Sequence, residues 1–430
     1  MSHIIVWFRK DLRLRDNPAL TEALKTGFKI IPLYILDETP FVRPLGGASK
    51  WWLHQSLKSL EFSLKNKGTH LVFKKGPALE ILKDISKSYE VKAIFWNRCY
   101  EPDAIQRDQE IKAFFPHARS FRGNLLEEPF EALKPYKVFT PFWKTFLGKS
   151  LRFDILEEPK NLKPHNIQWG DDFESLDLEP KNWGERFKDF WLPGEKGAFQ
   201  KFDLFLKEKI NHYHEMRDFA DHDGCSRLSP HLAFGEISVR EIYHILQNAA
   251  PNELGASKFL SEIGWRDFSA HLLYHNPRMV HKNLNSKFDD FPWVWDSPLL
   301  EKWKRGETGY DIVDAGMNEL WQTGYMHNRV RMIAASFLVK DLLVHWKAGE
   351  EWFWDTLVDA DLANNVASWQ WVAGCGADAA PFFRVFNPLL QQEKFDPKGR
   401  YVQKWLKKKL PPVVNHGDAR KKALELFKSL

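Results

Sequence analysis

Residues 4–36 read IIVWFRKDLRLRDNPALTEALKTGFKIIPLYIL, and this stretch decides the fold class of the first part of the chain. Its first apolar run, residues 4–8, has the length and composition of a buried strand. The run Asp16-Asn-Pro18 then supplies an N-cap and a first-turn proline, which predict that a helix follows. A second apolar run at residues 29–36 indicates another strand. The stretch therefore predicts a strand, helix and strand unit.

The same alternation continues along the chain. We expect helices near residues 49–66 and 77–88, and strands at residues 70–73 and 91–95. Strands that alternate with helices predict a Rossmann-like α/β domain with a parallel sheet, which we assign to residues 1–135. This domain has no GxGxxG motif and no P-loop, so the usual dinucleotide site is not expected in it.

The later part of the chain has a different pattern. Residues 136–195 are largely polar and interrupted by prolines, which predicts an interdomain linker. Beyond residue 196 the strand pattern disappears and helical periodicity dominates. The clearest helical runs are residues 199–211, 239–247, 258–273 and 324–344. We therefore expect an all-α second domain over residues 196–430.

The composition limits the class of protein. Apolar residues make up 43% of the chain and charged residues 28%, as in an ordinary soluble globular protein. The 19 tryptophans and 33 phenylalanines suit a flat ligand or stacked bases, and the net charge of +5 permits a polyanionic partner without requiring one. Three scattered cysteines and the lack of a membrane-length apolar run favour a cytoplasmic protein without a membrane partner.

The stretch from Asp359 to Trp371 does not resemble part of a hydrophobic core. In a helix, Asp361, Asn365 and Trp369 lie four residues apart and form one stripe, while Trp371 points roughly to the opposite side. A core helix would carry apolar residues on such a stripe, because buried acids and amides need partners. The pattern therefore indicates a polar and aromatic ligand, such as a redox cofactor.

Three other runs are ambiguous on their own. Residues 224–230 predict a helix start with Ser229 as the N-cap, which either binds an anion or simply caps the helix. Glu262 and Arg266 have the spacing of a surface salt bridge on a helix. Residues 327–332 are rich in hydrogen-bond donors, which suit phosphate as well as solvent. No catalytic triad, paired-carboxylate signature or metal-ligand spacing stands out, so we expect no metal.

An ordered series of motifs resembles the photolyase and cryptochrome flavoprotein family. The series begins with VWFRKDLRLRDN at residues 6–17 and extends to about Trp405, which is nearly the full length. Intermediate motifs are SKWWL at 49–53, YKVFTPFW at 136–143, TGYDIVDA at 308–315 and DAAPFFRVFNP at 378–388. The resemblance implies an N-terminal antenna domain and a helical C-terminal catalytic domain that binds FAD.

The resemblance also implies roles for individual residues. Those that would bind the FAD are Tyr213, Cys225, Ser226, Arg227, Leu228, Ser229, Arg266, Asn328, Arg331, Asp359, Asp361 and Asn365. Among them, Arg331 would pair with Asp359 and Asn365 would face flavin N5. Cys225 stands where the family commonly has threonine, so a good hydroxyl donor is lost while the backbone amides remain.

A chain of tryptophans is implied as the route for electrons. Trp369, Trp346 and Trp293 would pass electrons from the surface to photoexcited oxidised flavin. Trp295 is a rival of Trp293 for the outer position.

A few positions separate the subgroups of the family. Plant-type cryptochromes usually carry Asp where this chain has Asn328 and Asn365. Six-four photolyases have a histidine pair where this chain reads His327-Asn328, and DASH-type relatives usually have tyrosine in place of Trp371. The chain thus matches cyclobutane dimer photolyases, and residues 353–361 look like those of class III enzymes and plant cryptochromes.

The implied activity is light-driven repair of cyclobutane pyrimidine dimers in DNA, by electron transfer from photoexcited reduced FAD to a flipped-out lesion. The residues expected to contact DNA or the lesion are Arg217, Glu262, Trp265, Asn328, Arg329, Met332 and Trp371. Glu262 would hydrogen-bond the dimer and stabilise its radical anion. Glu101 lies in the segment expected to contact a methenyltetrahydrofolate antenna chromophore.

Two alternatives remain open at this point. One is a cryptochrome-like blue-light photoreceptor that signals through a partner protein, against which Asn328, Asn365 and Trp371 argue, as does a family match that ends about 25 residues before Leu430. The other is a flavoprotein that has lost repair. We expect a monomer that acts on damaged DNA and has no obligate protein partner.

Overall fold

The N-terminal part of the computed structural model is built on a five-stranded parallel sheet with the order β3-β2-β1-β4-β5. The structure describes residues 2–179, 183–249, 254–295, 297–379 and 384–430, so part of the motif at 378–388 lies outside the described residues. The strands are β1 (His3–Phe8), β2 (Lys29–Asp37), β3 (Val72–Gly76), β4 (Val91–Asn97) and β5 (Ala118–Phe121). The predicted parallel α/β domain is confirmed.

The helices of this part are α1 (Pro18–Lys25), α2 (Gly47–Asn66), α3 (Ala78–Ser88) and α4 (Pro102–Phe114). Asn17 caps α1, because its side chain accepts a hydrogen bond from Leu20 N at 3.1 Å. Strand β3 begins two residues later than the sequence predicts, since the backbone amide of Leu71 donates to the Glu61 carboxylate at 2.6 Å instead of joining the sheet. Strand β5 has no apolar run, which is why its sequence gave no signal.

Residues 136–195, predicted to be a linker, include one helix and two short 3₁₀ helices. These are α5 (Phe139–Gly148), Phe173–Leu176 and Gly184–Asp189. Helix α5 packs against α10 (Leu254–His275) through stacked rings, with Phe139 and Trp265 at a centroid distance of 3.9 Å. The domain boundaries at residues 135 and 195 stay a prediction.

The described residues beyond 196 form helices and loops, apart from an isolated bridge between Val294 and Val344. Besides α10, the helices are α6 (Glu195–Glu208), α7 (Tyr213–Met216), α8 (Ser229–Ala233), α9 (Val239–Ala249), α11 (Pro298–Arg305), α12 (Asp311–Thr323), α13 (Asn328–Ser336), α14 (Trp346–Thr356), α15 (Leu362–Ala373), α16 (Pro388–Phe395), α17 (Arg400–Trp405) and α18 (His416–Lys428). The predicted helical second domain is confirmed.

The helix predicted at residues 324–344 is wrong at both ends. Gly324 lies in the left-handed region with φ of 67° and ends α12, so the next helix begins only after His327 caps it. A π-helical segment, Phe337–Asp341, continues α13, and Leu343 with φ of 57° ends the run.

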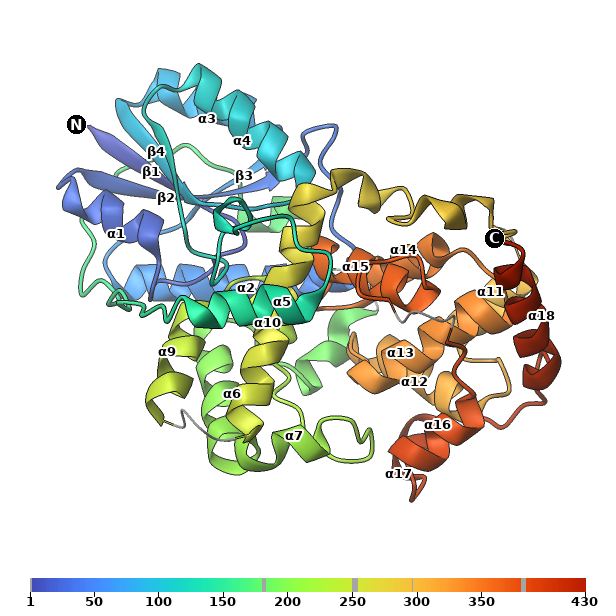
Figure 1. Ribbon diagram of the computed structural model, residues 1–430. Coiled ribbons are helices and arrows are strands. Elements are labelled where there is room, and N and C mark those ends of the chain that lie inside the picture. Colours follow the sequence, from blue (N-terminus) through green and yellow to red (C-terminus); the bar gives the residue numbers. More distant parts are fainter. Residues whose placement is uncertain (1, 180–182, 250–253, 296, 380–383) are drawn as a thin grey trace.

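The two parts of the chain lie side by side, and α2 of the sheet domain packs against α14 of the helical domain (Figure 1). Helix α10 runs from the lower edge of the molecule to its middle and contacts α5, α7 and α15 (Figure 1). Its residues therefore reach both the interdomain region and the interior of the helical domain. This placement makes α10 one wall of the site described next.

Candidate functional site

A cavity of about 600 Å³ opens in the helical domain between α7, α8, α10, α13 and α15. Every residue that the sequence predicts to bind the cofactor lines it: Tyr213, Cys225, Ser226, Arg227, Leu228, Ser229, Arg266, Asn328, Arg331, Asp359, Asp361 and Asn365. A volume of this size lies within the range of small-molecule and cofactor sites. The fold thus gathers residues that are up to 152 positions apart into one concave surface.

The segment before α8 approaches the cavity with an unusual backbone. Arg227 has φ of 55°, a left-handed conformation that non-glycine residues seldom adopt. Among the described residues, the backbone amides of Ser226 and Arg227 have no hydrogen-bond acceptor. Unpaired amides beside a cavity suit an anionic group such as a phosphate. This observation fits a dinucleotide cofactor whose phosphates lie at this segment.

Ser229 is not the N-cap of α8, contrary to the sequence prediction. The cap position is Leu228, which makes no side-chain capping bond, and Ser229 is the first helical residue. The Ser229 hydroxyl donates instead to Asp359 Oδ2 at 2.6 Å. The serine was a good cap candidate by type, but the helix begins one residue earlier than predicted, so Ser229 lies inside the first turn, where its hydroxyl is directed to the Asp359 carboxylate.

Asp359 and Arg331 form a bidentate ion pair in the cavity wall. Arg331 Nη1 and Nη2 donate to the two Asp359 oxygens at 3.1 and 2.8 Å, and Arg331 Nε donates to the Met326 carbonyl at 2.7 Å. Burial alone would lower the pKa of Arg331, but Asp359 raises it above its ordinary value. The predicted pairing is therefore present, and it places a fixed guanidinium at the cavity.

Helix α15 carries the stripe predicted from its sequence. Asp361 caps the helix by accepting from Asn364 N at 2.9 Å, and Asn365 and Trp369 follow on the same side. All three side chains line the cavity. Trp371 lines it too, although it lies about 200° around the helix from Trp369, so the cavity extends over both flanks of α15.

Glu262 does not form the predicted salt bridge with Arg266. Its carboxylate accepts from Arg217 Nη1 and lies 3.1 Å from Lys258 Nζ, whereas Arg266 Nη1 donates to the Asn124 carbonyl at 2.7 Å. Spacing of four residues allows a pair, but Arg217 is closer in space and Arg266 turns towards the interdomain loop. The Glu262 side chain is 27% exposed and lines the cavity, with the largely buried Arg217 and the more exposed Lys258 beside it.

The other residues predicted to contact the lesion divide into two groups. Arg217, Trp265, Asn328, Met332 and Trp371 line the cavity together with Glu262. Arg329 does not line it; its guanidinium pairs with Asp218 at 3.0 Å and lies over the Phe395 ring at 4.2 Å.

Cys225, at the position where the resemblance implies a threonine, makes a part-buried contact with His327. Its sulfur is 3.4 Å from His327 Nε2 and 3.6 Å from the Arg217 carbonyl oxygen. Burial raises the pKa of Cys225 to about 11 and lowers that of His327 to about 4, so both groups are neutral near pH 7. The thiol is therefore a packing group with a weak hydrogen bond.

Two of the predicted electron-chain tryptophans lie away from the cavity. Trp369 lines it and contacts Trp303 at a centroid distance of 6.1 Å, while Trp346, the first residue of α14, is fully buried and does not line it. His345 contacts Trp346 at 5.3 Å, Trp293 at 5.6 Å and Trp295 at 3.8 Å. Because both outer candidates contact the same histidine, this geometry does not choose between them.

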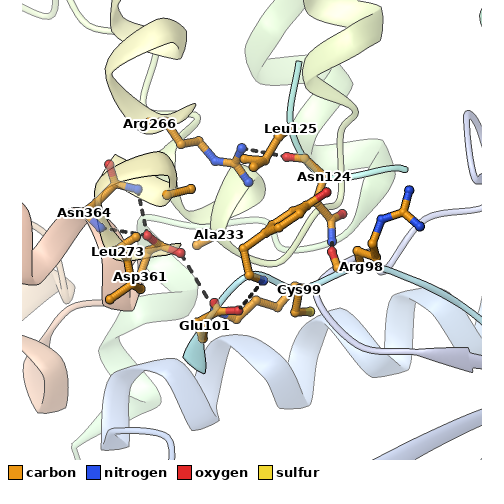
Figure 2. Close-up of a pocket in the computed structure, with 14 residues that line it drawn as sticks. Arg98, Cys99, Glu101, Asn124, Leu125, Ala233, Arg266, Leu273, Asp361 and Asn364 are labelled. Atoms are coloured by element: carbon orange, nitrogen blue, oxygen red, sulfur yellow. Dashed lines mark hydrogen bonds and ion pairs between the residues drawn. The ribbon is translucent and has the colours of Figure 1, made fainter. Parts of the chain in front are cut away.

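Glu101 lines a separate, much smaller pocket of about 40 Å³ between the two domains (Figure 2). Lys10 Nζ donates to its carboxylate and lies 3.8 Å from Asp361 Oδ2. Burial would raise the pKa of Glu101, but Lys10 outweighs it and lowers the pKa to about 2. This pocket is far smaller than the large cavity, and the contact of Glu101 with a folate stays a prediction.

Sequence reasoning missed several side chains of the large cavity, including Tyr325, Phe353, Asn364, Ser368 and Asp378. Four of them lie in runs that the sequence singles out, at residues 353–361, 359–371 and 378–388, but the sequence assigns them no role there, and only the fold shows that they line the cavity. Within the described residues, no group of three or more His, Cys, Asp or Glu side chains is arranged to hold a metal ion, and no helix has the length and apolarity to cross a membrane.

Comparison with known proteins agrees with the architecture. Residues 4–163 match the family model described as DNA photolyase, and residues 259–415 match that of the FAD binding domain of DNA photolyase. The chain is 44% identical to the deoxyribodipyrimidine photo-lyase of Agrobacterium fabrum over 99% of this chain and 97% of that protein. It is 36% identical to cryptochrome-1 of Arabidopsis thaliana over 94% of this chain and 62% of that protein.

A solved structure gives the same result at the level of the fold. The bacterial class III photolyase from Agrobacterium tumefaciens superposes with a TM-score of 0.95 at 43% identity, over 100% of this chain and 98% of that one. The chain belongs to the photolyase and cryptochrome family.

Proposed function

We propose that this protein is a class III photolyase that uses light and FAD to repair cyclobutane pyrimidine dimers in DNA. The observation that carries the proposal is that one cavity holds both the residues expected to bind the flavin and most of those expected to contact the lesion. Its full-length likeness to a deoxyribodipyrimidine photo-lyase supports the proposal. When bound and reduced, FAD supplies the photoexcited electron for dimer splitting.

The residues of the cavity suit FAD. The unpaired amides of Ser226 and Arg227 would hold the phosphates, and the Arg331–Asp359 pair would lie beside the ring system and ribose. Tyr213 and Phe353 supply apolar surface, and Asp361 and Asn365 supply polar groups. A lining that combines apolar and aromatic side chains with fixed polar groups is typical of a cofactor site.

The lesion side of the cavity suits a flipped pyrimidine dimer. Trp265 and Trp371 supply flat apolar walls, and Trp265 is held by its stacking on Phe139. Glu262 would accept a hydrogen bond from the dimer's imide edge, while Arg217 would move from Glu262 towards a backbone phosphate. Extruding a lesion already damaged in its pairing costs less than extruding an intact base.

We extend the proposal to the outer residues. Trp369, Trp346 and either Trp293 or Trp295 would carry electrons to the flavin, with His345 between the outer rings. Arg329 would contact the DNA backbone outside the cavity. Methenyltetrahydrofolate stays the predicted antenna chromophore, with Glu101 in the segment that would contact it. We further propose a cytoplasmic monomer.

The competing function is a blue-light photoreceptor, which the 36% identity to a plant cryptochrome favours. The amides at Asn328 and Asn365 and the indole at Trp371 support repair instead. To test the proposal, the purified and fully reduced protein is illuminated with an oligonucleotide that contains thymine dimers. We expect thymine absorbance to recover in the light and not in the dark; no recovery with fully reduced FAD would overturn the repair function.

A further inference from the structure

The amide of Asn365 has both of its hydrogens committed on the side away from the cavity. Its Nδ2 donates to the Glu350 backbone carbonyl at 2.9 Å and to Glu350 Oε1 at 2.8 Å. A side-chain amide has two donor hydrogens and one carbonyl oxygen. The atom that Asn365 can still offer to a ligand in the cavity is therefore Oδ1, an acceptor.

The orientation of the Asn365 amide follows from the chemistry of its partner, Glu350, as well as from the modest distances between them. A backbone carbonyl and a carboxylate can only accept hydrogen bonds, so the reverse orientation would set three oxygens against one another. Glu350 thus selects the orientation. Glu350 is fully buried, so no water can supply its oxygens with the hydrogen bond that a reversed Asn365 amide would withdraw. Burial therefore strengthens the preference for the observed orientation of the amide.

Glu350 is itself held from both domains. Arg43, in the loop between β2 and α2, donates to Glu350 Oε1 at 2.7 Å and to Oε2 at 3.2 Å. Lys347 donates to Oε2 at 2.7 Å from within α14. Arg43 also lies over the Trp354 ring at 4.2 Å, which fixes the guanidinium in the interface. Two cations compensate one buried carboxylate.

We propose that Glu350 is a positioning residue that turns the carbonyl oxygen of Asn365 towards the flavin, and that Arg43 of the sheet domain holds Glu350 in place for this purpose. The inference rests on the proposed function, because it takes Asn365 to face flavin N5. Reduced flavin carries a hydrogen at N5 and can donate it, whereas N5 of oxidised flavin is an acceptor. An acceptor at Oδ1 therefore stabilises the reduced flavin that repair requires and disfavours the oxidised one.

The test compares Glu350→Gln with Glu351→Gln, which changes the exposed neighbour on the same helix. Glutamine at 350 can itself donate, so the variant removes one of the two acceptors that hold the Asn365 amide and leaves only the backbone carbonyl of residue 350 against an amide that presents its nitrogen to N5. A redox titration of the bound flavin, without DNA, reads out the balance of reduced and oxidised forms. At a fixed potential we expect the reduced-to-oxidised ratio to fall about tenfold in Glu350→Gln, the size of one hydrogen bond to a charged group, and to stay unchanged in Glu351→Gln.

A second variant keeps the test decisive if Glu350→Gln retains no flavin. Arg43→Met removes the cation and leaves Glu350 present, so we expect a change in the same direction but smaller. If Glu350→Gln, or Arg43→Met in its place, keeps its flavin and titrates like Glu351→Gln, the positioning role is overturned. A wild-type protein that shows no repair while the variants shift the titration would sink the proposed function and leave this inference standing.

Discussion

The large cavity and the pocket beside Glu101 meet at Asp361, which lines both, yet similar residues do different things in them. In the small pocket Lys10, Glu101 and Asp361 lie against one another beside only about 40 Å³ of space. In the large cavity Glu262 shares its carboxylate with Arg217 and Lys258 in front of about 600 Å³ of open space. The charged groups of the small pocket, which have little space beside them, contact one another across the two domains. The charged groups beside the large cavity have space for a ligand, which can replace one of their partners.

Among the changes that test this difference between the two sites, Arg331→Ala should have the largest effect on flavin binding and stability. The change leaves the Asp359 carboxylate buried without its bidentate partner, which costs about 3–5 kcal/mol of folding free energy, and it removes a guanidinium from the flavin side of the cavity. We expect most bound FAD to be lost, as measured by flavin absorbance per protein, with a lower unfolding temperature. Arg305→Ala, which removes an exposed arginine on α11, is the control. Equal flavin content in both variants would contradict the assignment.

Trp369→Phe should separate the supply of electrons from repair. Trp369 lines the cavity and contacts Trp303 and Phe353, so its loss breaks the first step from the flavin outwards. We expect photoreduction of oxidised flavin to fall nearly to zero while chemically reduced enzyme still repairs dimers. Trp405→Phe, a buried tryptophan on α17, serves as the control. Normal photoreduction in Trp369→Phe would remove this residue from the chain.

Glu262→Ala should weaken repair without disturbing the flavin. Removing a preorganised hydrogen-bonding group from the lesion side is expected to slow repair about a hundredfold. Bound flavin should stay at the wild-type level, because Glu262 pairs with Arg217 and Lys258 and with none of the flavin-side residues. The exposed Glu208→Ala on α6 is the matched control. If Glu262→Ala loses its flavin, the residue is structural.

Glu101→Gln should have the smallest effect and should act through pH. Lys10 holds the pKa of Glu101 at about 2 in the folded protein, below the ordinary value of 4.5. The ionised pair therefore stabilises the fold above about pH 4.5, and this stability is lost as the pH falls towards 2. Between those values the wild type should lose more unfolding free energy in urea titrations than Glu101→Gln does. Identical pH profiles would show that the pair does not stabilise the fold, and repair at neutral pH should be nearly unchanged.

The sequence predicts elements well where the pattern is local. Strands with apolar runs and the stripe on α15 lie where periodicity places them, while β5 escapes because its residues are mostly polar. Partners that are distant in sequence explain the errors. Ser229 bonds Asp359 instead of capping α8, and Glu262 pairs with Arg217 instead of Arg266. Nothing local announces that Arg43 reaches Glu350 across 307 positions.

The family motifs succeed for a physical reason as well. The residues of the cavity are spread over helices α7 to α15, and no spacing rule joins them, but those with predicted roles stand in short runs of the sequence. A resemblance in several such runs at once therefore identifies the set. The resemblance predicts the position of Arg329 less well, because Arg329 lies outside the cavity and its contacts depend on the shape of the surface.

The central claim is that flavin and lesion occupy one cavity, and the fluorescence lifetime of the reduced flavin tests it directly. Electron transfer to a dimer in the same cavity competes with emission, so the lifetime should shorten when dimer-containing oligonucleotide is added. Undamaged oligonucleotide of the same sequence should leave it unchanged, and thymine should be recovered only in the dimer sample. A lifetime that is equal with both oligonucleotides, at concentrations where both are bound, would contradict a shared cavity.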